Sequence, residues 1–232
     1  LLADFLFQTS IYSEKKRKKL KPLLLHCFIY FIVFEILLLP ILQFKKAFLL
    51  GMIISVLHFL INFIKNKLEK SFPQRRLQIW IFSINQLIHF ALLIGMNYIF
   101  NLENSVSNLY IKLQEYENFK IIILYIFVFS IIFEPASVFI RKLFTSISSK
   151  TYPKANLEEL KAGNIIGKLE RIIIAILLLN NQFGVIGFVL TAKSIARFKQ
   201  MENRDFAEKY LIGTLTSFLI VLVTVLILKG LL

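Results

Sequence analysis

The sequence contains little cysteine and little charge. Its one cysteine, Cys27, lies within an apolar run of this 232-residue chain. A single cysteine excludes an internal disulfide framework, and it excludes zinc sites built from several thiolates. Charged residues make up 18% of the chain, against 57% hydrophobic residues and a mean hydropathy of +0.69. A soluble domain of this size could not bury so much apolar surface, so we expect an integral membrane protein.

Acidic residues are also scarce, with 14 Asp and Glu against 28 Lys and Arg, which gives a net charge of +14. The basic residues lie in short blocks between apolar runs, as in membrane proteins oriented by positive charge. The richer blocks are residues 14–21, 65–76 and 141–161, and the poorer ones are 43–46 and 101–120. We expect the richer blocks to face the cytoplasm and contact anionic membrane lipids, and we expect no nucleic-acid partner.

Long apolar runs dominate the rest of the chain. A helix needs about 20 apolar residues to cross a bilayer. Five runs meet this requirement, namely residues 22–42, 47–64, 77–100, 121–140 and 206–228. Residues 1–12 are too short to span, and we interpret them as the end of a truncated first span. The expected fold is all-α, a single polytopic transmembrane helix bundle with about six spans.

Residues 165–197 predict a re-entrant helical hairpin. Both flanks are basic, and residues 180–184 interrupt the apolar run with Asn and Gln. Two arms of about 15 residues reach roughly 22 Å each, short of a hydrocarbon core of roughly 30 Å. A turn of Asn and Gln at membrane depth is tolerated only if it is buried in protein or faces water, so we expect the hairpin to pack inside the bundle. We also expect Glu170 to lie within one water of a histidine, with Arg171 or Arg197 compensating its charge.

The common catalytic and nucleotide-binding motifs are missing. No HExxH, GxSxG, GxGxxG or phosphate-binding loop occurs, which excludes a nucleotide-driven pump and gives no local motif for a metal. Instead, all three histidines and Asp4 lie inside apolar runs, roughly 6 to 18 Å below the cytoplasmic surface at 1.5 Å per residue. Polar groups are costly in lipid, so these residues predict a pocket that opens to the cytoplasm.

Imidazole and carboxylate groups are ligands for zinc, manganese or iron. We therefore expect a divalent metal, zinc or manganese. The candidate ligands are His26, His58, His89 and Asp4, with Glu170 as a further carboxylate. Lys193 and Arg197, one turn apart, are candidates to bind a phosphate or lipid headgroup. The alternative is that both anchor a helix end at the membrane surface. Further candidate substrate contacts are Arg171, Gln8 and Gln86.

Several short elements resemble the bacterial membrane proteins of domain-of-unknown-function family 3307, over nearly the whole chain. They are Leu2 to Thr9, Leu25-His26, His58 to Asn62, Gln86 to His89, Gly167 to Arg171, Ala192 to Phe198 and Ala207 to Thr214. The resemblance implies a multi-pass protein of the bacterial inner membrane. It also marks Asn62 and Asn85, where the family pattern usually has Asp, as catalytic positions beside Asp4 and Glu170. Asn keeps the shape of Asp and loses the charge that a general base needs.

Three functional hypotheses follow. The first is a metal-assisted hydrolase or transferase that acts on an anionic lipid-like substrate. The second is a transporter, channel or membrane effector with the hairpin as its gate. The third is a non-catalytic membrane subunit with a lost active site, alone, in a homo-oligomer or with another protein. Few ionisable residues besides Glu35 and Glu134 lie in the outer parts of the spans, which favours a one-sided pocket over a conduit.

Overall fold

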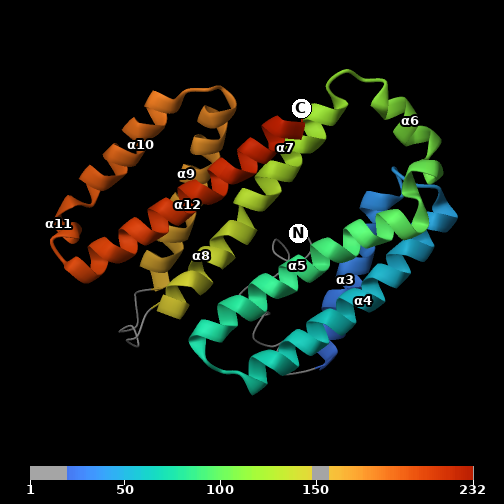
Figure 1. The fold of residues 1–232 in the computed structure, drawn as a ribbon, viewed down its shortest axis with the longest axis horizontal. Coiled ribbons are helices and arrows are strands. Elements are labelled where there is room, and N and C mark those ends of the chain that lie inside the picture. The colour runs from blue at the N-terminus through green and yellow to red at the C-terminus, as the bar shows by residue number, and fades with distance from the viewer. Residues whose placement is uncertain (1–19, 148–156, 232) are drawn as a thin grey trace. The chain divides into compact units, whose positions relative to one another are not determined.

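The structure is a computed structural model that describes residues 20–147 and 157–231 (Figure 1). This part of the chain is helical, and its only β-type pairing is one isolated bridge between Leu42 and Val106. The expected all-α fold is confirmed for it. Asp4, Gln8 and the predicted truncated span over residues 1–12 lie outside the described residues. The chain divides into two compact units, Leu1–Lys120 (unit 1) and Ile121–Leu232 (unit 2).

The described part of unit 1, residues 20–120, consists mainly of helices that follow one another through short turns. They are α3 (Leu20–Leu38), α4 (Phe44–Ser71), α5 (Arg75–Phe100), the 3-10 turn η1 (Leu102–Ser105) and α6 (Asn108–Gln114). Short connections make consecutive helices antiparallel neighbours, and α4 packs against both α3 and α5. Gly51 of α4 allows a close approach to α3, because the Glu35 carboxyl group occupies the space of the missing side chain.

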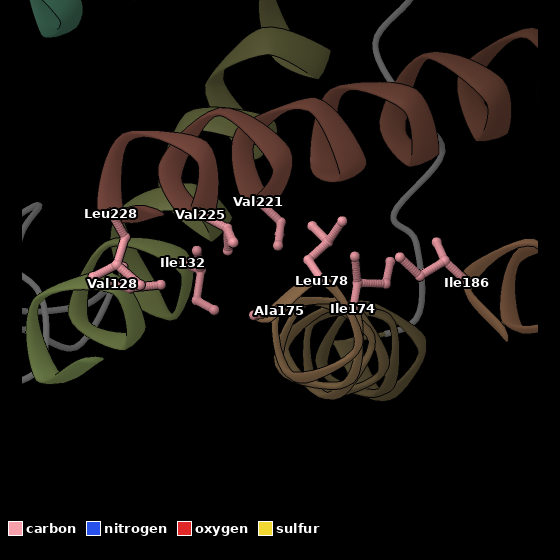
Figure 2. Packing of buried hydrophobic residues seen from close by; sticks show 9 residues of the cluster. All are labelled: Val128, Ile132, Ile174, Ala175, Leu178, Ile186, Val221, Val225 and Leu228. Carbon is pink, nitrogen blue, oxygen red and sulfur yellow. The ribbon is translucent and has the colours of Figure 1, made fainter. Parts of the chain in front are cut away.

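Unit 2 begins with α7 and ends with the longest helix of the unit. Its elements are α7 (Phe119–Ile132), α8 (Glu134–Ile147), α9 (Leu157–Leu179), α10 (Phe183–Ala196), α11 (Phe198–Met201) and α12 (Arg204–Leu231). Val221, Val225 and Leu228 recur at helical spacing on α12 and face apolar side chains of α7, α9 and α10 (Figure 2). Gly213 of α12 lies against the Phe144 ring of α8, 2.6 Å from where a Cβ atom would be.

Among residues 20–147 and 157–231, five helical stretches are long and apolar enough to cross a membrane. They are Lys21–Leu38, Phe44–Ser71, Arg75–Phe100, Phe119–Ile147 and Arg204–Leu231. Each corresponds to one of the five predicted runs, and together they are compatible with a multi-pass membrane protein. The expected sixth span corresponds to residues 1–12, which lie outside the described residues.

The fourth stretch is broken at Phe133, between α7 and α8. Pro135 explains the break, because proline has no N–H to donate and its ring crowds the preceding helical turn. The predicted apolar run over residues 121–140 thus lies within the stretch Phe119–Ile147, which consists of the two consecutive helices α7 and α8.

A helical hairpin is formed by α9 and α10, which are joined by a tight turn at residues 180–182 (Figure 1). Its helix α10 has 14 residues, about 21 Å, close to the predicted arm. Its other helix has 23 residues, about 35 Å, because α9 already begins at Leu157, within a stretch of helix-favouring Leu, Glu and Lys. The prediction of two equally short arms is wrong. Asn180, Asn181 and Gln182 are exposed, so burial of the tip by protein is also wrong for the described chain.

Candidate functional site

The three histidines come together in unit 1, each from a different helix. His58 of α4 stands in the middle, with its Nε2 atom 3.2 Å from Nε2 of His26 on α3. Its Nδ1 atom lies 2.9 Å from Nε2 of His89 on α5. His26 and His58 are 2% and 1% exposed, while His89 is half-buried. We call this arrangement the histidine row. It places the residues that the sequence singled out in one buried, hydrogen-bonded group.

Two further residues fix the middle of the histidine row. Asn62 follows His58 by one helical turn, and its Nδ2 atom lies 2.9 Å from the His58 Nε2 atom and 3.0 Å from the His58 carbonyl oxygen. The Tyr30 ring of α3 stacks on the His58 ring, with centroids 3.9 Å apart and planes 10° apart. The sequence analysis overlooked Tyr30, although it follows His26 by one turn and therefore shares its helix face.

His89, at one end of the histidine row, is hydrogen-bonded to a backbone carbonyl group. His89 Nδ1 lies 2.7 Å from the carbonyl oxygen of Asn85, one turn earlier in α5. The Asn85 side chain is buried, and its Oδ1 atom has no hydrogen-bond partner among the described residues. Gln86, which the sequence analysis assigned to substrate, is half-buried on the same helix. Asn85 thus contributes its main chain to the row.

The histidine row is not the predicted metal centre of three imidazoles. His58 turns one ring nitrogen to His26 and the other to His89, so one ion cannot contact all three rings in this arrangement. Within residues 20–147 and 157–231, no group of three or more His, Cys, Asp or Glu side chains could hold a metal ion. His26 and His58 are the two buried rings, and their Nε2 atoms face each other. The predicted ligand Asp4 lies outside the described residues.

Glu170 has its partner within unit 2. Its Oε2 atom accepts from Lys193 Nζ at 2.5 Å, and the same ammonium group lies 3.2 Å from Thr214 Oγ1 of α12 and over the Tyr210 ring. The ion-pair partner of Glu170 is therefore Lys193, where the sequence predicted Arg171 or Arg197. Because the hairpin folds back at Asn181, residues at similar distances from the turn face each other. Once the turn is placed at Asn181, Glu170 and Lys193 are almost equally far from it, which explains their pairing.

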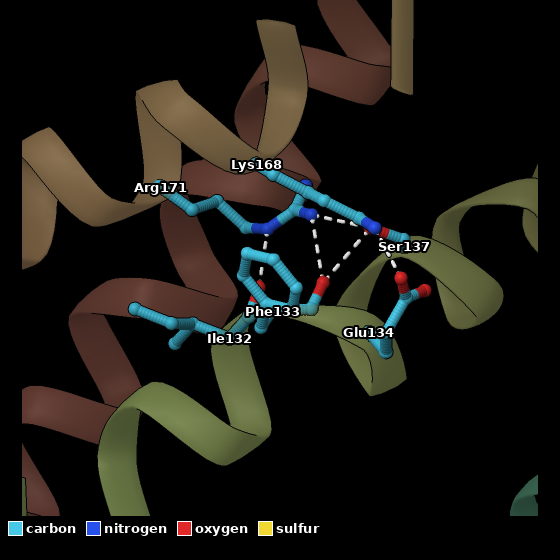
Figure 3. Close-up of polar contacts among 6 residues, drawn as sticks. All are labelled: Ile132, Phe133, Glu134, Ser137, Lys168 and Arg171. Carbon is cyan, nitrogen blue, oxygen red and sulfur yellow. Dashed lines mark hydrogen bonds and ion pairs between the residues drawn. The ribbon is translucent and has the colours of Figure 1, made fainter. Parts of the chain in front are cut away.

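Arg171 supports the break between α7 and α8. It is 3% exposed, and its Nε atom donates to the Ile132 carbonyl oxygen at 2.5 Å (Figure 3). Another guanidinium nitrogen donates to the Phe133 carbonyl oxygen at 3.1 Å and to Ser137 Oγ at 2.5 Å. Ile132 is the last residue of α7 and Phe133 lies at the break, and carbonyl groups at a helix C-terminus lack helical donors, so they can accept from a side chain.

Residues 168–171 of α9 include three charged side chains, which contact three other helices. Lys168 pairs with Glu134 of α8, Glu170 pairs with Lys193 of α10, and Arg171 bonds to α7 and α8. The sequence analysis overlooked Lys168 and did not assign Glu134 a partner. Arg197 lies at the C-terminal end of α10 and is half-buried. Substrate contacts by Arg171, Lys193 and Arg197, and the proximity of Glu170 to a histidine, stay predictions.

Comparison with known proteins bears on unit 1. A family model described as "Protein of unknown function (DUF3307)" matches residues 1–119, just over half of the chain. The match ends one residue before the end of unit 1 and so includes the whole histidine row. It does not extend to Gly167–Arg171 or to the other C-terminal elements on which the resemblance was also based. No match was found among curated proteins or among solved structures.

Proposed function

We propose, for a chain that belongs to the DUF3307 family of proteins of unknown function, that unit 1 forms the active site of a membrane-embedded, metal-assisted hydrolase or transferase. Its substrate is an anionic lipid-like molecule that reaches the site from the cytoplasmic leaflet of a bacterial inner membrane. One observation carries the proposal, namely that His26 and His58 are both buried with their Nε2 atoms 3.2 Å apart.

The cost of burying these groups supports a functional role. Imidazole rings are polar, and polar or ionisable groups inside apolar spans are retained chiefly where they pair or do chemistry. Neighbouring nitrogen ligands of a tetrahedral zinc ion, with bonds of about 2.0 Å, are about 3.3 Å apart. The separation of the His26 and His58 nitrogens is close to this value. The pair therefore fits two positions of a metal site.

The ion that this pair fits is a divalent metal, zinc or manganese. His26 and His58 would hold it, with the predicted ligand Asp4 as a third. When bound, such an ion activates water and polarises a phosphoryl or acyl oxygen. Tyr30 and Asn62 position the His58 imidazole. The Tyr30 ring stacks on the His58 ring, and Asn62 donates to its Nε2 atom.

The alternative of a transporter, channel or membrane effector has less support from the same residues. A proton path needs groups that both accept and release a proton along its whole length. The histidine row ends on the Asn85 carbonyl oxygen, which accepts a hydrogen bond and has no proton to pass on. A path through these three histidines therefore stops inside unit 1.

Metal binding by the purified full-length chain tests the proposal. We expect zinc or manganese to bind the wild type with about one ion per chain, and we expect His26→Ala and His58→Ala to lose most of it. Glu103→Gln is the matched control, because Glu103 lies in η1 of the same unit and is exposed. The protein with bound metal should release headgroup or phosphate from membrane lipids, and the two alanine variants should not.

Three outcomes count against the proposal. Binding of less than about a tenth of an equivalent of either metal per chain, at saturating metal concentration, would exclude a metal-assisted reaction. Metal binding without turnover of any phospholipid or isoprenoid phosphate would favour the non-catalytic subunit instead. Solute or ion flux through proteoliposomes that persists in His58→Ala would favour a conduit elsewhere in the chain.

A further inference from the structure

We infer that His89 is a positioning residue, which fixes the proton of His58 on Nδ1 and thereby leaves the His58 Nε2 atom unprotonated towards His26 and Asn62. The inference rests on the proposed function only for the use of that Nε2 atom. The proton positions follow from the hydrogen-bond geometry of the histidine row.

The starting point is the backbone of α5. The Asn85 carbonyl oxygen can only accept, so the His89 Nδ1 atom 2.7 Å away carries the proton of their hydrogen bond. A neutral imidazole carries one ring proton, and the other nitrogen is then an acceptor. The His89 Nε2 atom is therefore an acceptor.

The acceptor role of His89 Nε2 determines which nitrogen of His58, on α4, carries the proton. The His58 Nδ1 atom lies 2.9 Å from His89 Nε2 and has to donate to it. The proton of neutral His58 is thus on Nδ1, and its Nε2 atom is unprotonated, with a lone pair that faces Asn62 and His26. This lone pair is the part of His58 that can bind a metal or accept a proton, because ring hydrogen bonds decide which nitrogen remains available.

Asn62 leads to the same result independently. Its Nδ2 atom lies 3.0 Å from the His58 carbonyl oxygen, and a carbonyl oxygen requires a donor, so the amide nitrogen rather than the oxygen occupies this position. The same nitrogen lies 2.9 Å from His58 Nε2, which therefore accepts. Two carbonyl groups on different helices, those of Asn85 and His58, thus require the same proton arrangement.

The chain is suited to a direct test because it contains only three histidines. Nitrogen-15 labelling of histidine gives six ring nitrogens, whose chemical shifts in nuclear magnetic resonance spectra distinguish protonated from unprotonated atoms. We expect His58 to show a protonated Nδ1 and an unprotonated Nε2 in metal-free wild-type protein. A protonated Nε2 atom in His58 would overturn the inference.

Two variants of His89 separate positioning from packing. Gln offers a side-chain oxygen that can accept from His58 Nδ1, whereas Leu offers no acceptor. We expect His89→Gln to preserve the wild-type spectrum of His58, and we expect His89→Leu to move proton density to Nε2. An unchanged His58 spectrum in His89→Leu would overturn the inference. If His89→Leu does not fold, the wild-type and His89→Gln spectra still decide.

Metal titration of the same variants distinguishes failure of this inference from failure of the proposed function. We expect zinc affinity to fall about 10- to 100-fold in His89→Leu and to recover in His89→Gln, as for residues that orient a metal-binding imidazole. Equal zinc affinity in wild type and His89→Leu would contradict the positioning role even if metal binds. The expected His58 spectrum without any metal binding would contradict only the proposed function.

Discussion

Lys229, near the end of α12, donates to Asn181 at the tip of the hairpin, with 2.6 Å between Nζ and Oδ1. The same ammonium group lies 2.8 Å from the Leu178 carbonyl oxygen, one of the last of α9. Cations near a helix C-terminus are favoured there, because the last carbonyl groups have no helical partner. Since α12 begins at Arg204, the hairpin tip lies beside the opposite end of that helix.

This contact predicts that the tip reaches the side of the membrane opposite the basic loops. The only cysteine, Cys27, is buried, so Cys27→Ala provides a background for single-cysteine labelling. We expect Gln182→Cys to react with a membrane-impermeant maleimide from the outside of intact cells. Gln74→Cys, in the exposed turn between α4 and α5, should react only after lysis. Failure of Gln182→Cys to react from outside would place the tip within the membrane, as a re-entrant hairpin requires.

Removal of the Arg171 side chain should destabilise unit 2. Arg171→Met leaves the Ile132 carbonyl oxygen without its side-chain donor and removes a second donor from the Phe133 carbonyl oxygen, which still accepts from the Ser137 hydroxyl group. A buried unsatisfied group costs about 1 to 3 kcal/mol. We expect a lower midpoint of thermal unfolding in detergent. Arg204→Ala is the control, because Arg204 is 91% exposed in its pair with Glu208 and such pairs contribute about 1 kcal/mol or less. Equal midpoints for the two variants would contradict the role of Arg171 at the helix break.

A methyl group at Gly213 should also destabilise unit 2. The Cβ atom of Gly213→Ala would lie 2.6 Å from the Phe144 ring, which has to move, and overpacking costs about 1 to 3 kcal/mol. Gly187→Ala in α10 is the control, since no atom lies within 4 Å of its added Cβ. The helix preference for alanine should leave that variant unchanged or stabilise it by about 1 kcal/mol. Thermal unfolding of both variants measures the difference, and a Gly213→Ala protein as stable as Gly187→Ala would contradict the close approach of α8.

Asn62→Asp should raise the affinity for zinc. The Asn62 amide group now donates to His58 Nε2, which is the position that a cation would otherwise satisfy. A carboxylate there adds an acceptor and a negative charge beside the two imidazoles, and we expect at least about a tenfold tighter binding by calorimetry. Asn97→Asp adds the same charge at an exposed position of α5 and should leave the affinity unchanged. Equal affinities of the two variants would argue against a metal at His58.

The sequence was sufficient for those parts of the fold that depend on local pattern. Apolar length predicted the five spanning stretches, and helical spacing placed Asn62 on the His58 face. A break near Pro135 was foreseeable from the missing N–H, although its partner Arg171 was not. That partner lies 36 residues further along the chain and on another helix.

The details that could not be predicted depend on how helices are rotated and aligned against each other. The pairing of Glu170 with Lys193 needs the turn to fall at Asn181 and not two residues away. Likewise, the division of the His58 nitrogens between His26 and His89 depends on the rotation of α4 between two neighbours. Neither quantity is contained in the composition or periodicity of a single helix.

The break at Phe133 supplies Arg171 with a substitute for a hydration shell. Two carbonyl oxygens and one hydroxyl oxygen take the positions that water oxygens would take around an exposed guanidinium group. These acceptors carry no net charge, so dissolved ions do not compete for them as they compete in an ion pair at the surface. The hydrogen bonds that hold Arg171 in the apolar interior therefore depend less on ionic strength than an ion pair at the surface does.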